Sequence, residues 1–407
     1  TPRAEGITDE IAGNLTMNKI VVLAYSGGLD TSVCVRWLAD RGWRVIAFMA
    51  NVGQGDPSAA AVKRAKVAGA SRVVIRDVRQ EFLTEFVWPA LKAHAVYEGK
   101  YLLATALSRP LIAKHLVEVA HEMKAHAVAH GCTGKGNDQV RFEVTARILD
   151  PSLKIIAPVR EWEFRSREDE IDYARRHRIP IDVSTHRPYS IDQNLWGTSI
   201  ESGVLENPWT EPPADTYRSI RSPERAASRP DTVTIGFTRG VPTHLNGHRQ
   251  PPVRLVERLN AIGAAHGIGR ADIMESRVVG IKSREVYEAP GGTILLEAHQ
   301  ELERLVLDRH LLQFKALVGM KYAELVYSGL WFTPLKASLD AFVEQTQRHV
   351  SGRIRLKLFK GSCQVVGRRS PHSLYRERLA TYSAKDQFDQ QAAEGFIKLF
   401  GLPYERQ

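Results

Sequence analysis

A short loop near the start of the chain carries residue types that hold phosphate. The loop reads Ser26-Gly27-Gly28-Leu29-Asp30-Thr31-Ser32 and joins an apolar stretch, residues 19–25, to an amphipathic stretch that runs to about residue 41. Adjacent glycines allow a tight turn that brings backbone N–H groups against an anion, and the dipole of a following helix favours negative charge there. The three hydroxyls of the loop add hydrogen-bond donors. We therefore predict a strand, a phosphate-binding loop and a helix.

The loop is not a Walker A loop. Such a loop needs Gly-Lys-Ser/Thr after four intervening residues, whereas the nearest basic side chain here, Arg36, lies further into the predicted helix. The pattern Ser-Gly-Gly-x-Asp-Thr/Ser resembles instead the pyrophosphate loop of the ATP pyrophosphatases, which cleave ATP between the α- and β-phosphates. This resemblance implies that the β,γ-pyrophosphate rests in the loop and that the AMP half goes to a substrate. An ordinary strand-turn-helix with a glycine turn is the alternative.

A second glycine-rich loop follows a predicted strand at residues 125–130. It reads GCTGKGNDQVR over residues 131–141, and its glycines permit a close approach of the backbone to a ligand. Thr133, Asn137, Asp138 and Arg141 offer a hydroxyl, an amide, a carboxylate and a guanidinium, which together can hold both charged ends of an amino acid. Ligands of open parallel sheets bind beyond the carboxyl ends of the strands, so we expect both loops to face one crevice.

A zinc site near this loop is the competing interpretation. His121, His126, His130 and Cys132 are ligand types, but His126, Val128 and His130 alternate with small alanines, as strand residues do. We expect no metal held by protein ligands there. The three cysteines of the chain are scattered and odd in number, which argues against a disulfide framework and predicts reduced thiols.

Composition indicates an enzyme of more than one domain. The chain has 407 residues, 43% of them hydrophobic and 25% charged, and no apolar run approaches the roughly 20 residues of a membrane span. With no secretory signal evident, we expect a cytoplasmic protein. The formal net charge of +10 would suit nucleic acid, but anionic small substrates explain it equally well. The basic run at residues 175–178 ends a helix capped by Ser166, so we interpret it as ordinary helix electrostatics.

Periodicity predicts an α/β fold in two main parts. Strands and helices alternate through the first half, which predicts an open parallel sheet covered on both faces. We expect strands at 19–25, 44–50, 72–76, 125–130 and 154–158, and helices at 57–69, 78–94 and 110–124. Proline, glycine and tryptophan become frequent at 187–230, and strand patterns follow at 233–237 and 353–359. The second part is therefore predicted to be α+β.

The predicted boundaries divide the chain into four parts. Residues 1–16 lack periodicity and precede Met17, so we interpret them as a leader or tail. A nucleotide-binding domain is expected at 17–182 and a synthetase domain, for substrate binding and assembly, at 183–380. Residues 381–407 form a predicted C-terminal helical arm with an apolar stripe at helical spacing.

Longer motifs make the resemblance more specific. In order and spacing, the chain resembles the argininosuccinate synthases through AYSGGLDTS, NVGQG, YEGKYLL, AHGCTGKGNDQVRFE, PYSIDQNLWG, GVLENPW, SREVYEAPGGTILL, KYAELVY and VVGRRSP. The match runs from Met17 to Pro403. It implies an adenine nucleotide α-hydrolase-like first domain and an AMP-forming carbon–nitrogen ligase of arginine biosynthesis. Such an enzyme joins L-citrulline to L-aspartate through citrullyl-AMP and releases pyrophosphate, with ATP and Mg²⁺ as its cofactors.

The resemblance also implies which residues bind each substrate. For ATP they are Ala24, Tyr25, Ser26, Gly27, Gly28, Leu29, Asp30, Thr31, Ser32, Ala50 and Gly131. For citrulline they are Tyr101, Asn137, Arg141, Ser190, Ser199, Glu275 and Tyr287. For aspartate they are Thr133, Asn137 and Asp138. From the chemistry, Asp30 is our candidate for arranging Mg²⁺ or the loop, with an ordinary carboxylate of a first helical turn as the alternative, and Asp138 is our candidate acceptor of the aspartate ammonium proton.

Three positions depart from the family pattern. Ala106 stands where relatives often have serine, Cys132 where many have alanine, and Glu285 where the family usually has glycine. None of these changes removes a group that the chemistry needs. Glu285 raises a question about the local backbone, because glycine adopts positive φ freely and glutamate does so at a cost. We interpret Cys132 as small packing and not as a nucleophile.

Two other functions remain open at this point. A tRNA-thiolating ATP pyrophosphatase would use the first loop and suit the basic charge, although the sequence shows neither paired cysteines nor an aromatic-rich basic platform. A non-catalytic nucleotide-binding module is the second alternative, and the dense polar loop at 131–141 argues against it. The argininosuccinate synthase resemblance further implies no nucleic acid or membrane partner, and a homotetramer in which the C-terminal arm packs on a neighbouring subunit.

Overall fold

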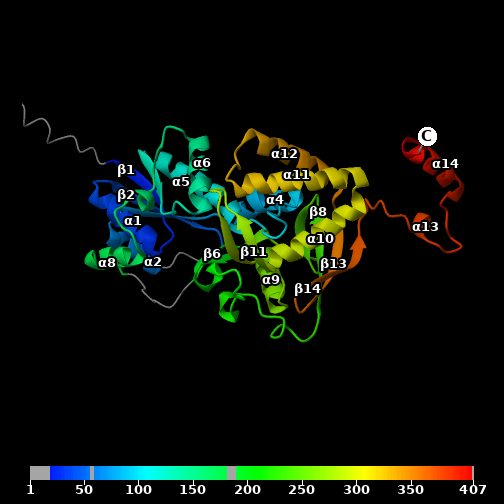
Figure 1. Ribbon diagram of the computed structural model, residues 1–407, viewed down its shortest axis with the longest axis horizontal. Coiled ribbons are helices and arrows are strands. Elements are labelled where there is room, and N and C mark those ends of the chain that lie inside the picture. Colours follow the sequence, from blue (N-terminus) through cyan, green and yellow to red (C-terminus); the bar gives the residue numbers. More distant parts are fainter. Residues whose placement is uncertain (1–18, 56–58, 181–188, 406–407) are drawn as a thin grey trace, which may run out of the picture.

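The computed structural model describes residues 19–55, 59–180 and 189–405. The predicted leader at 1–16 and the predicted boundary between 182 and 183 lie outside the described residues. The described chain forms three sheets, one parallel and two antiparallel, with helices packed around them (Figure 1). Among the described residues, no helix has both the length and the apolar character needed to cross a membrane.

The first half forms the predicted parallel sheet. Its order is β3-β2-β1-β4-β5, and every neighbouring pair is parallel. The strand order reverses between β1 and β4, which lie side by side with Val21 opposite Ala127. A crevice is expected where the order reverses, beyond the carboxyl ends of these two strands. The strands are β1 Ile20–Ala24, β2 Arg44–Asn51, β3 Arg72–Asp77, β4 Ala127–His130 and β5 Lys154–Ile156.

Helices cover both faces of this sheet, as predicted. Strand side chains alternate between faces, so Val21 and Leu23 pack with α1, α2 and α8, whereas Val22 packs with α5. Helix α8 begins with a capping box between Ser166 and Asp169, which confirms the predicted start. The helices are α1 Leu29–Asp40, α2 Ala59–Ala68, α5 Ala104–Glu122, α6 Asn137–Leu149, α7 Pro158–Glu161 and α8 Arg167–Arg176.

Two predicted boundaries at prolines are wrong. The helix expected to start at Pro110 begins earlier, at Ala104, and contains Pro110 in its interior. Proline suits a first helical turn because it has no N–H, but here the Tyr101 hydroxyl accepts hydrogen bonds from the N–H groups of Thr105 and Ala106 and so caps an earlier start. The strand expected at 154–158 ends at Ile156, and Pro158 opens α7.

The helical tract expected at 78–94 is continuous but irregular. It consists of α3 Arg79–Glu81, the π-helix η1 Phe82–Val87 and α4 Trp88–Ala93. It ends at His94, whose φ of 52° lies in the left-handed region. Phe82, Leu83 and Val87 are buried in the main core, so packing supports the irregular turn.

The second half contains the two antiparallel sheets, which confirms the α+β prediction. In β13, Ile354, Leu356 and Leu358 are fully buried and alternate with exposed basic side chains, as the sequence pattern predicts. One sheet has the order β11-β12-β7-β6 and the other β10-β9-β8-β13-β14. The strands are β6 Ser190–Gln193, β7 Thr198–Glu201, β8 Asp231–Thr238, β9 Val241–Leu245, β10 His248–Arg249, β11 Arg270–Ser276, β12 Lys282–Glu288, β13 Gly352–Phe359 and β14 Ser362–Arg369.

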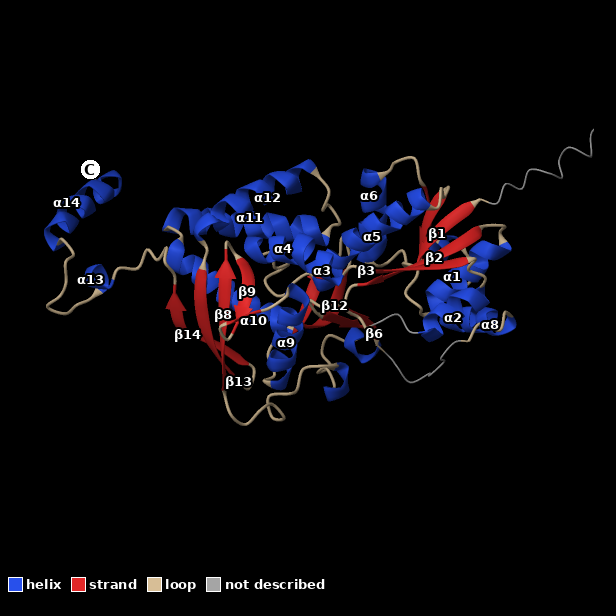
Figure 2. Cartoon of the chain, turned by 180° about the vertical axis from the view of Figure 1, so that it is seen from behind, coloured by secondary structure: helices blue, strands red, loops and turns tan. Residues whose placement is uncertain are grey.

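Four longer helices pack around these sheets, and a C-terminal arm follows. The helices are α9 Pro252–Ala265, α10 Pro290–Val306, α11 Arg309–Tyr327 and α12 Pro334–Thr346. The arm carries α13 Glu377–Ala380 and α14 Gln390–Gly401, and both views show it standing away from the body of the chain (Figures 1 and 2). The predicted arm helix therefore exists, but it begins at Gln390, where the Asp389 side chain caps it.

Candidate active site

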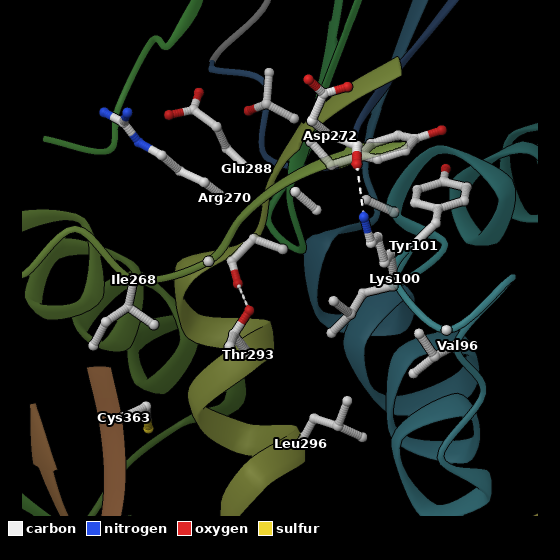
Figure 3. A pocket seen from close by; sticks show the side chains of 18 of the residues that line it. Val96, Lys100, Tyr101, Ile268, Arg270, Asp272, Glu288, Thr293, Leu296 and Cys363 are labelled. Atoms are coloured by element: carbon white, nitrogen blue, oxygen red, sulfur yellow. Dashed lines mark hydrogen bonds between the residues drawn. The ribbon is translucent and has the colours of Figure 1, made fainter. Parts of the chain in front are cut away.

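Two hollows share a wall formed by two tyrosines. The rings of Tyr101 and Tyr287 stack with their centroids 4.0 Å apart, and both residues line both hollows. The larger hollow, about 540 Å³, is mainly apolar, and its charged groups already have partners. The Glu288 carboxylate accepts hydrogen bonds from the backbone N–H groups of residues 218–220. Lys100 donates to the Asp272 carbonyl, as Figure 3 shows. We therefore look for chemistry in the smaller hollow, about 360 Å³, which we call the polar cleft.

The polar cleft lies between the parallel sheet and the β11-β12-β7-β6 sheet. Its walls come from the loop after β1, the loop after β4, the first turns of α5 and α6, and strands of the antiparallel sheet. This is the crevice expected where the strand order reverses. Its lining residues are Ser26, Asp30, Tyr101, Thr105, Arg109, Gly131, Cys132, Thr133, Gly136, Asn137, Asp138, Arg141, Ser190, Ile191, Asp192, Ser199, Glu201, Glu275, Arg277, Glu285 and Tyr287.

The loop after β1 has the geometry of a phosphate cradle. Gly27 has a φ of 84°, and a Cβ there would lie 2.9 Å from the Cβ of Ala61, so the turn requires glycine. Gly28 caps α1 in an extended conformation and donates its N–H to Ser26 Oγ at 3.3 Å. Ser26 Oγ also lies 3.0 Å from Thr31 Oγ1. The start of α1 thus points its N–H groups toward the end of the cleft where Ser26 lies.

Not every predicted ATP residue faces the cleft. Ser26, Asp30 and Gly131 line it. The others that do not line it lie in β1, in the loop, in the first turn of α1 and in β2: Ala24, Tyr25, Gly27, Gly28, Leu29, Thr31 and Ala50. The Ser32 side chain does not line the cleft. Its side chain is fully buried, its hydroxyl donates to the Gly28 carbonyl at 2.6 Å, and the Tyr25 hydroxyl lies 3.0 Å away, so Ser32 stabilises the loop from inside.

The two glycine-rich loops touch each other. A Cβ on Gly131 would lie 3.0 Å from Thr31 Cγ2, so glycine allows the loop after β4 to approach the start of α1. Beside this contact, Asp30 lies next to Glu170 of α8. Burial, followed by the Asp30 charge, raises the pKa of the Glu170 carboxyl to about 8. The Glu170 carboxyl therefore stays mostly protonated at neutral pH.

Arg141 holds a free donor in the cleft. Its Nε donates to the Tyr327 carbonyl at 2.9 Å, and its Nη1 donates to Asp138 Oδ1 at 3.0 Å. Within the part of the chain that the structure describes, its buried Nη2 has no hydrogen-bond partner. A buried donor without a partner is costly, so a ligand acceptor at this point would gain a strong, charge-assisted hydrogen bond.

Asp138 belongs to a network of two carboxylates and two guanidinium groups. Its Oδ2 accepts from Arg109 Nε at 2.9 Å, and Arg109 also bonds to Asp192. Burial alone would raise the pKa of the Asp138 carboxyl, but the charges of Arg109 and Arg141 outweigh burial and lower it. A carboxylate in this setting is a weak base. The structure therefore argues against Asp138 as the acceptor of the aspartate ammonium proton.

Glu275 forms the opposite wall with two tyrosines. Only 2% of Glu275 is exposed, and its two oxygens accept hydrogen bonds from the hydroxyls of Tyr287, at 2.5 Å, and Tyr327, at 2.6 Å. Burial raises the pKa of Tyr101, which stacks on Tyr287, to about 12, so the Tyr101 hydroxyl stays protonated at neutral pH. The predicted citrulline residues Tyr101, Asn137, Arg141, Ser190, Ser199, Glu275 and Tyr287 all line this one cleft, as do the predicted aspartate residues Thr133, Asn137 and Asp138.

Several cleft residues were missed by the sequence analysis: Thr105, Arg109, Asp192, Glu201 and Arg277. Thr105 and Arg109 precede Pro110, where the helix was predicted to begin, so they were assigned to no element. Thr105 Oγ1 in fact lies 2.9 Å from Ser199 Oγ. Asp192 lies two residues after Ser190 in β6, so both side chains are on the same face of the strand. This spacing could have identified Asp192 as a cleft residue.

His121, His126, His130 and Cys132, the ligand types near the second loop, are not gathered at one point. His126 accepts from the backbone N–H of Ile20, His121 pairs with Asp150, and His130 pairs with Glu143. Each histidine thus has its own protein partner. Burial, followed by the charge of Asp138, raises the pKa of the Cys132 thiol, which disfavours a nucleophilic thiolate.

The chain is similar to the argininosuccinate synthases over nearly its whole length. The model of the arginosuccinate synthase N-terminal HUP domain matches residues 20–180, and that of the arginosuccinate synthase C-terminal domain matches residues 189–406. The argininosuccinate synthase of Thermoanaerobacter sp. (strain X514) is 55% identical over 383 residues, which cover 94% of this chain and 93% of the relative. Those of Carboxydothermus hydrogenoformans and Aquifex aeolicus are 55% and 54% identical, and each alignment covers 95% of this chain with 97% and 96% of the relative.

Proposed function

Because the chain belongs to the argininosuccinate synthase family, we propose that the polar cleft is the site where it joins citrulline to aspartate. The protein is an ATP-dependent carbon–nitrogen ligase of arginine biosynthesis. The observation that supports the assignment of the cleft is the convergence of a phosphate cradle, a buried free arginine donor and a carboxylate wall around one hollow. A tRNA-thiolating activity is not favoured, because both family models are those of argininosuccinate synthase.

The chemistry requires activation of citrulline. A ureido carbon is a poor electrophile, since two nitrogens stabilise its carbonyl and no good leaving group is present. Attack of the ureido oxygen on the α-phosphate of ATP forms citrullyl-AMP and releases pyrophosphate, for which the Ser26 loop is the cradle. The aspartate nitrogen then displaces AMP. No protein nucleophile is needed, so the residues act by positioning and by electrostatic stabilisation.

The contacts suggest how each amino acid is held. We assign citrulline to the side of the cleft formed by Arg141, Glu275 and the Tyr101–Tyr287 pair, with the free Nη2 of Arg141 on its carboxylate. Aspartate goes to the loop of Thr133 and Asn137. Asp138 serves it indirectly, by holding Arg109 and Arg141 close to one another.

A magnesium ion fits the oxygen-rich end of the cleft beside the cradle. Asp30 lines the cleft from the first turn of α1, and a carboxylate together with phosphate oxygens is the donor set that Mg²⁺ prefers. We propose that Asp30 holds Mg²⁺ with the phosphates of ATP. The ion would balance the negative charge of the departing pyrophosphate.

Product analysis tests the proposed reaction. The protein is incubated with ATP and aspartate, with and without citrulline, and the phosphorus species are followed by ³¹P NMR. We expect AMP and pyrophosphate in equal amounts and only when citrulline is present. ADP and phosphate as the main products would contradict the proposal, since they require cleavage at the γ-phosphate.

A further inference from the structure

Arg277 connects the antiparallel sheet to the glycine-rich loop after β4. It lies directly after β11, and its Nη1 donates to the Lys135 carbonyl at 3.3 Å. The next residue, Val278, donates its N–H to Asn137 Oδ1 at 2.9 Å. These two contacts join the β11–β12 turn to residues 135–137, so one guanidinium spans the two parts of the chain that face each other across the polar cleft.

The other nitrogens of Arg277 fix its position. Its Nε donates to Ser283 Oγ at 2.8 Å, and its Nη2 donates to Glu285 Oε1 at 2.8 Å and to Glu201. The register of β12 on β7 pairs Val286 with Ile200, which brings Glu285 and Glu201 next to each other on neighbouring strands. Two carboxyl groups thus meet at one nitrogen.

The carboxyl groups around Arg277 favour a proton on Glu285. The charged groups that face Glu285 are Glu201 on β7, Glu275 on β11 and Arg277 after it, so three carboxyl groups meet one cation. Only 5% of Glu285 is exposed. Burial, followed by the charges of Glu201 and Glu275, raises the pKa of Glu285 to about 9. At neutral pH, Glu285 can therefore donate its O–H to Glu201 and accept from Arg277.

We propose that Glu285 is a positioning residue for the amino-acid substrates: it shares a proton with Glu201 and holds Arg277 against residues 135–137. The backbone at Glu285 takes no positive φ, so the glutamate sits in β12 without strain. The proposal goes beyond the assignment of the cleft and rests on it, because residues 133–138 are the aspartate side of that site. If Arg277 loses its contacts to Glu285 and Glu201, the substrate-binding loop loses its anchor on the antiparallel sheet.

The decisive comparison is between Glu285→Ala and Glu285→Gln. Glutamine can accept from Arg277 and donate to Glu201, as the protonated acid does, whereas alanine can do neither. For Glu285→Ala we expect KM for citrulline and aspartate to rise about tenfold, with a smaller change in kcat and in KM for ATP. Glu285→Gln is expected to recover most of that loss. Calorimetric titration of each variant with citrulline measures the same effect without turnover.

The pH profile separates this role from a purely structural one. In the wild-type protein, loss of the Glu285 proton near pH 9 places a further negative charge beside Glu201 and Glu275, so KM for the amino acids should rise above that pH. In Glu285→Gln the rise should be smaller, because the amide does not ionise there and only the substrates' own ammonium groups titrate. A rise of equal size in both proteins would overturn the proposal.

Controls keep the outcomes distinct. Glu211→Gln removes an exposed carboxyl that does not line the cleft, and it should leave both KM values and their pH profiles as in the wild type. If Glu285→Ala does not fold, Arg277→Lys is the second route and should raise KM in the same way, since lysine lacks the planar fork. Unaltered KM values in Glu285→Ala or in Arg277→Lys would refute the positioning role of Glu285. A melting temperature that falls while KM stays constant would refute it as well. Absence of argininosuccinate synthesis by the wild-type protein would instead refute the proposed function.

Discussion

Two of the three nitrogens of Arg141 are bound by the protein and the third has no protein partner among the described residues, which indicates where a ligand binds. Nε and Nη1 are used by the protein, on the Tyr327 carbonyl and on Asp138, while Nη2 is buried with no partner among the described residues. The guanidinium also lies 4.9 Å from the centroid of the Tyr327 ring. The protein contacts thus fix the plane of the fork and leave one donor for the ligand.

Replacing Arg141 with lysine should weaken citrulline binding although the charge remains. A single ammonium cannot keep the contacts to Tyr327 and Asp138 and also bind a carboxylate. The loss of a charge-assisted hydrogen bond predicts an affinity about 10- to 100-fold lower, measured by isothermal titration calorimetry. Arg147→Lys, an exposed exchange on the same helix, is the control and should bind citrulline as the wild type does. Equal affinities for the two variants would contradict the assigned role.

At the scale of elements, the packing of α8 against α1 depends on a proton. Glu170 in α8 lies beside Asp30 in α1, and its pKa is raised from an ordinary value of 4.5 to about 8, by burial first and then by the Asp30 charge. A raised pKa means that the folded state binds the proton more tightly than the unfolded chain does. The stability contributed by this carboxyl is therefore full below pH 4.5 and is lost as the pH rises to about 8.

Glu170→Gln should consequently stabilise the protein at high pH and not at low pH. We expect its melting temperature to exceed that of the wild type by about 2 °C at pH 8.5, after allowance for solvent screening, and to match it at pH 5. Differential scanning calorimetry without ligands makes the measurement. Glu168→Gln in the same helical turn is exposed, and its effect should not vary between these two pH values. A stabilisation of the same size at both pH values would rule out the raised pKa of Glu170.

At the scale of the whole molecule, the C-terminal arm leaves an apolar face uncovered. No residue of α14 is buried, and Phe396 and Phe400, each 65% exposed, stack with their centroids 5.4 Å apart. Docking of this helix on its own subunit, the alternative to an intersubunit contact, is not what the structure shows (Figure 2). We propose that the arm packs on a neighbouring subunit of a homotetramer, in which closed symmetry makes the contact reciprocal.

Disrupting this face should lower the oligomeric state. Full burial of one phenylalanine side chain contributes about 1.5–3 kcal/mol, so Phe396→Glu combined with Phe400→Glu removes a large part of the contact. Multi-angle light scattering should show a smaller assembly, and truncation from Ala384 onward should do the same. Lys398→Glu changes the charge of the same helix without touching its apolar face, so it should keep the native mass. Retention of the tetramer by the double variant would show that the arm is not an assembly element.

The sequence by itself determined the features that depend on neighbouring residues. Hydrophobic periodicity predicted the parallel sheet, the buried face of β13 and the arm helix, because side-chain spacing along one segment decides which face is apolar. The two polar loops also showed their chemistry locally, since glycines and hydroxyls next to a helix start bind anions wherever they occur. Nearly every predicted amino-acid contact was carried over from motifs, and all of these residues line one cleft.

Only the tertiary structure decided which ionisable groups that are distant in the sequence lie next to one another. It brought Glu170 to Asp30, Arg109 to Asp138 and Arg277 to Glu285, and it turned the Ser32 hydroxyl away from the cleft. The start of α5 was misplaced for the same reason, because its cap is the hydroxyl of Tyr101 and not a capping residue of a familiar type. A local pattern reports what a residue can do. Protonation states and free donors depend on burial and on partners from other strands and helices, and these exist only after the chain has folded.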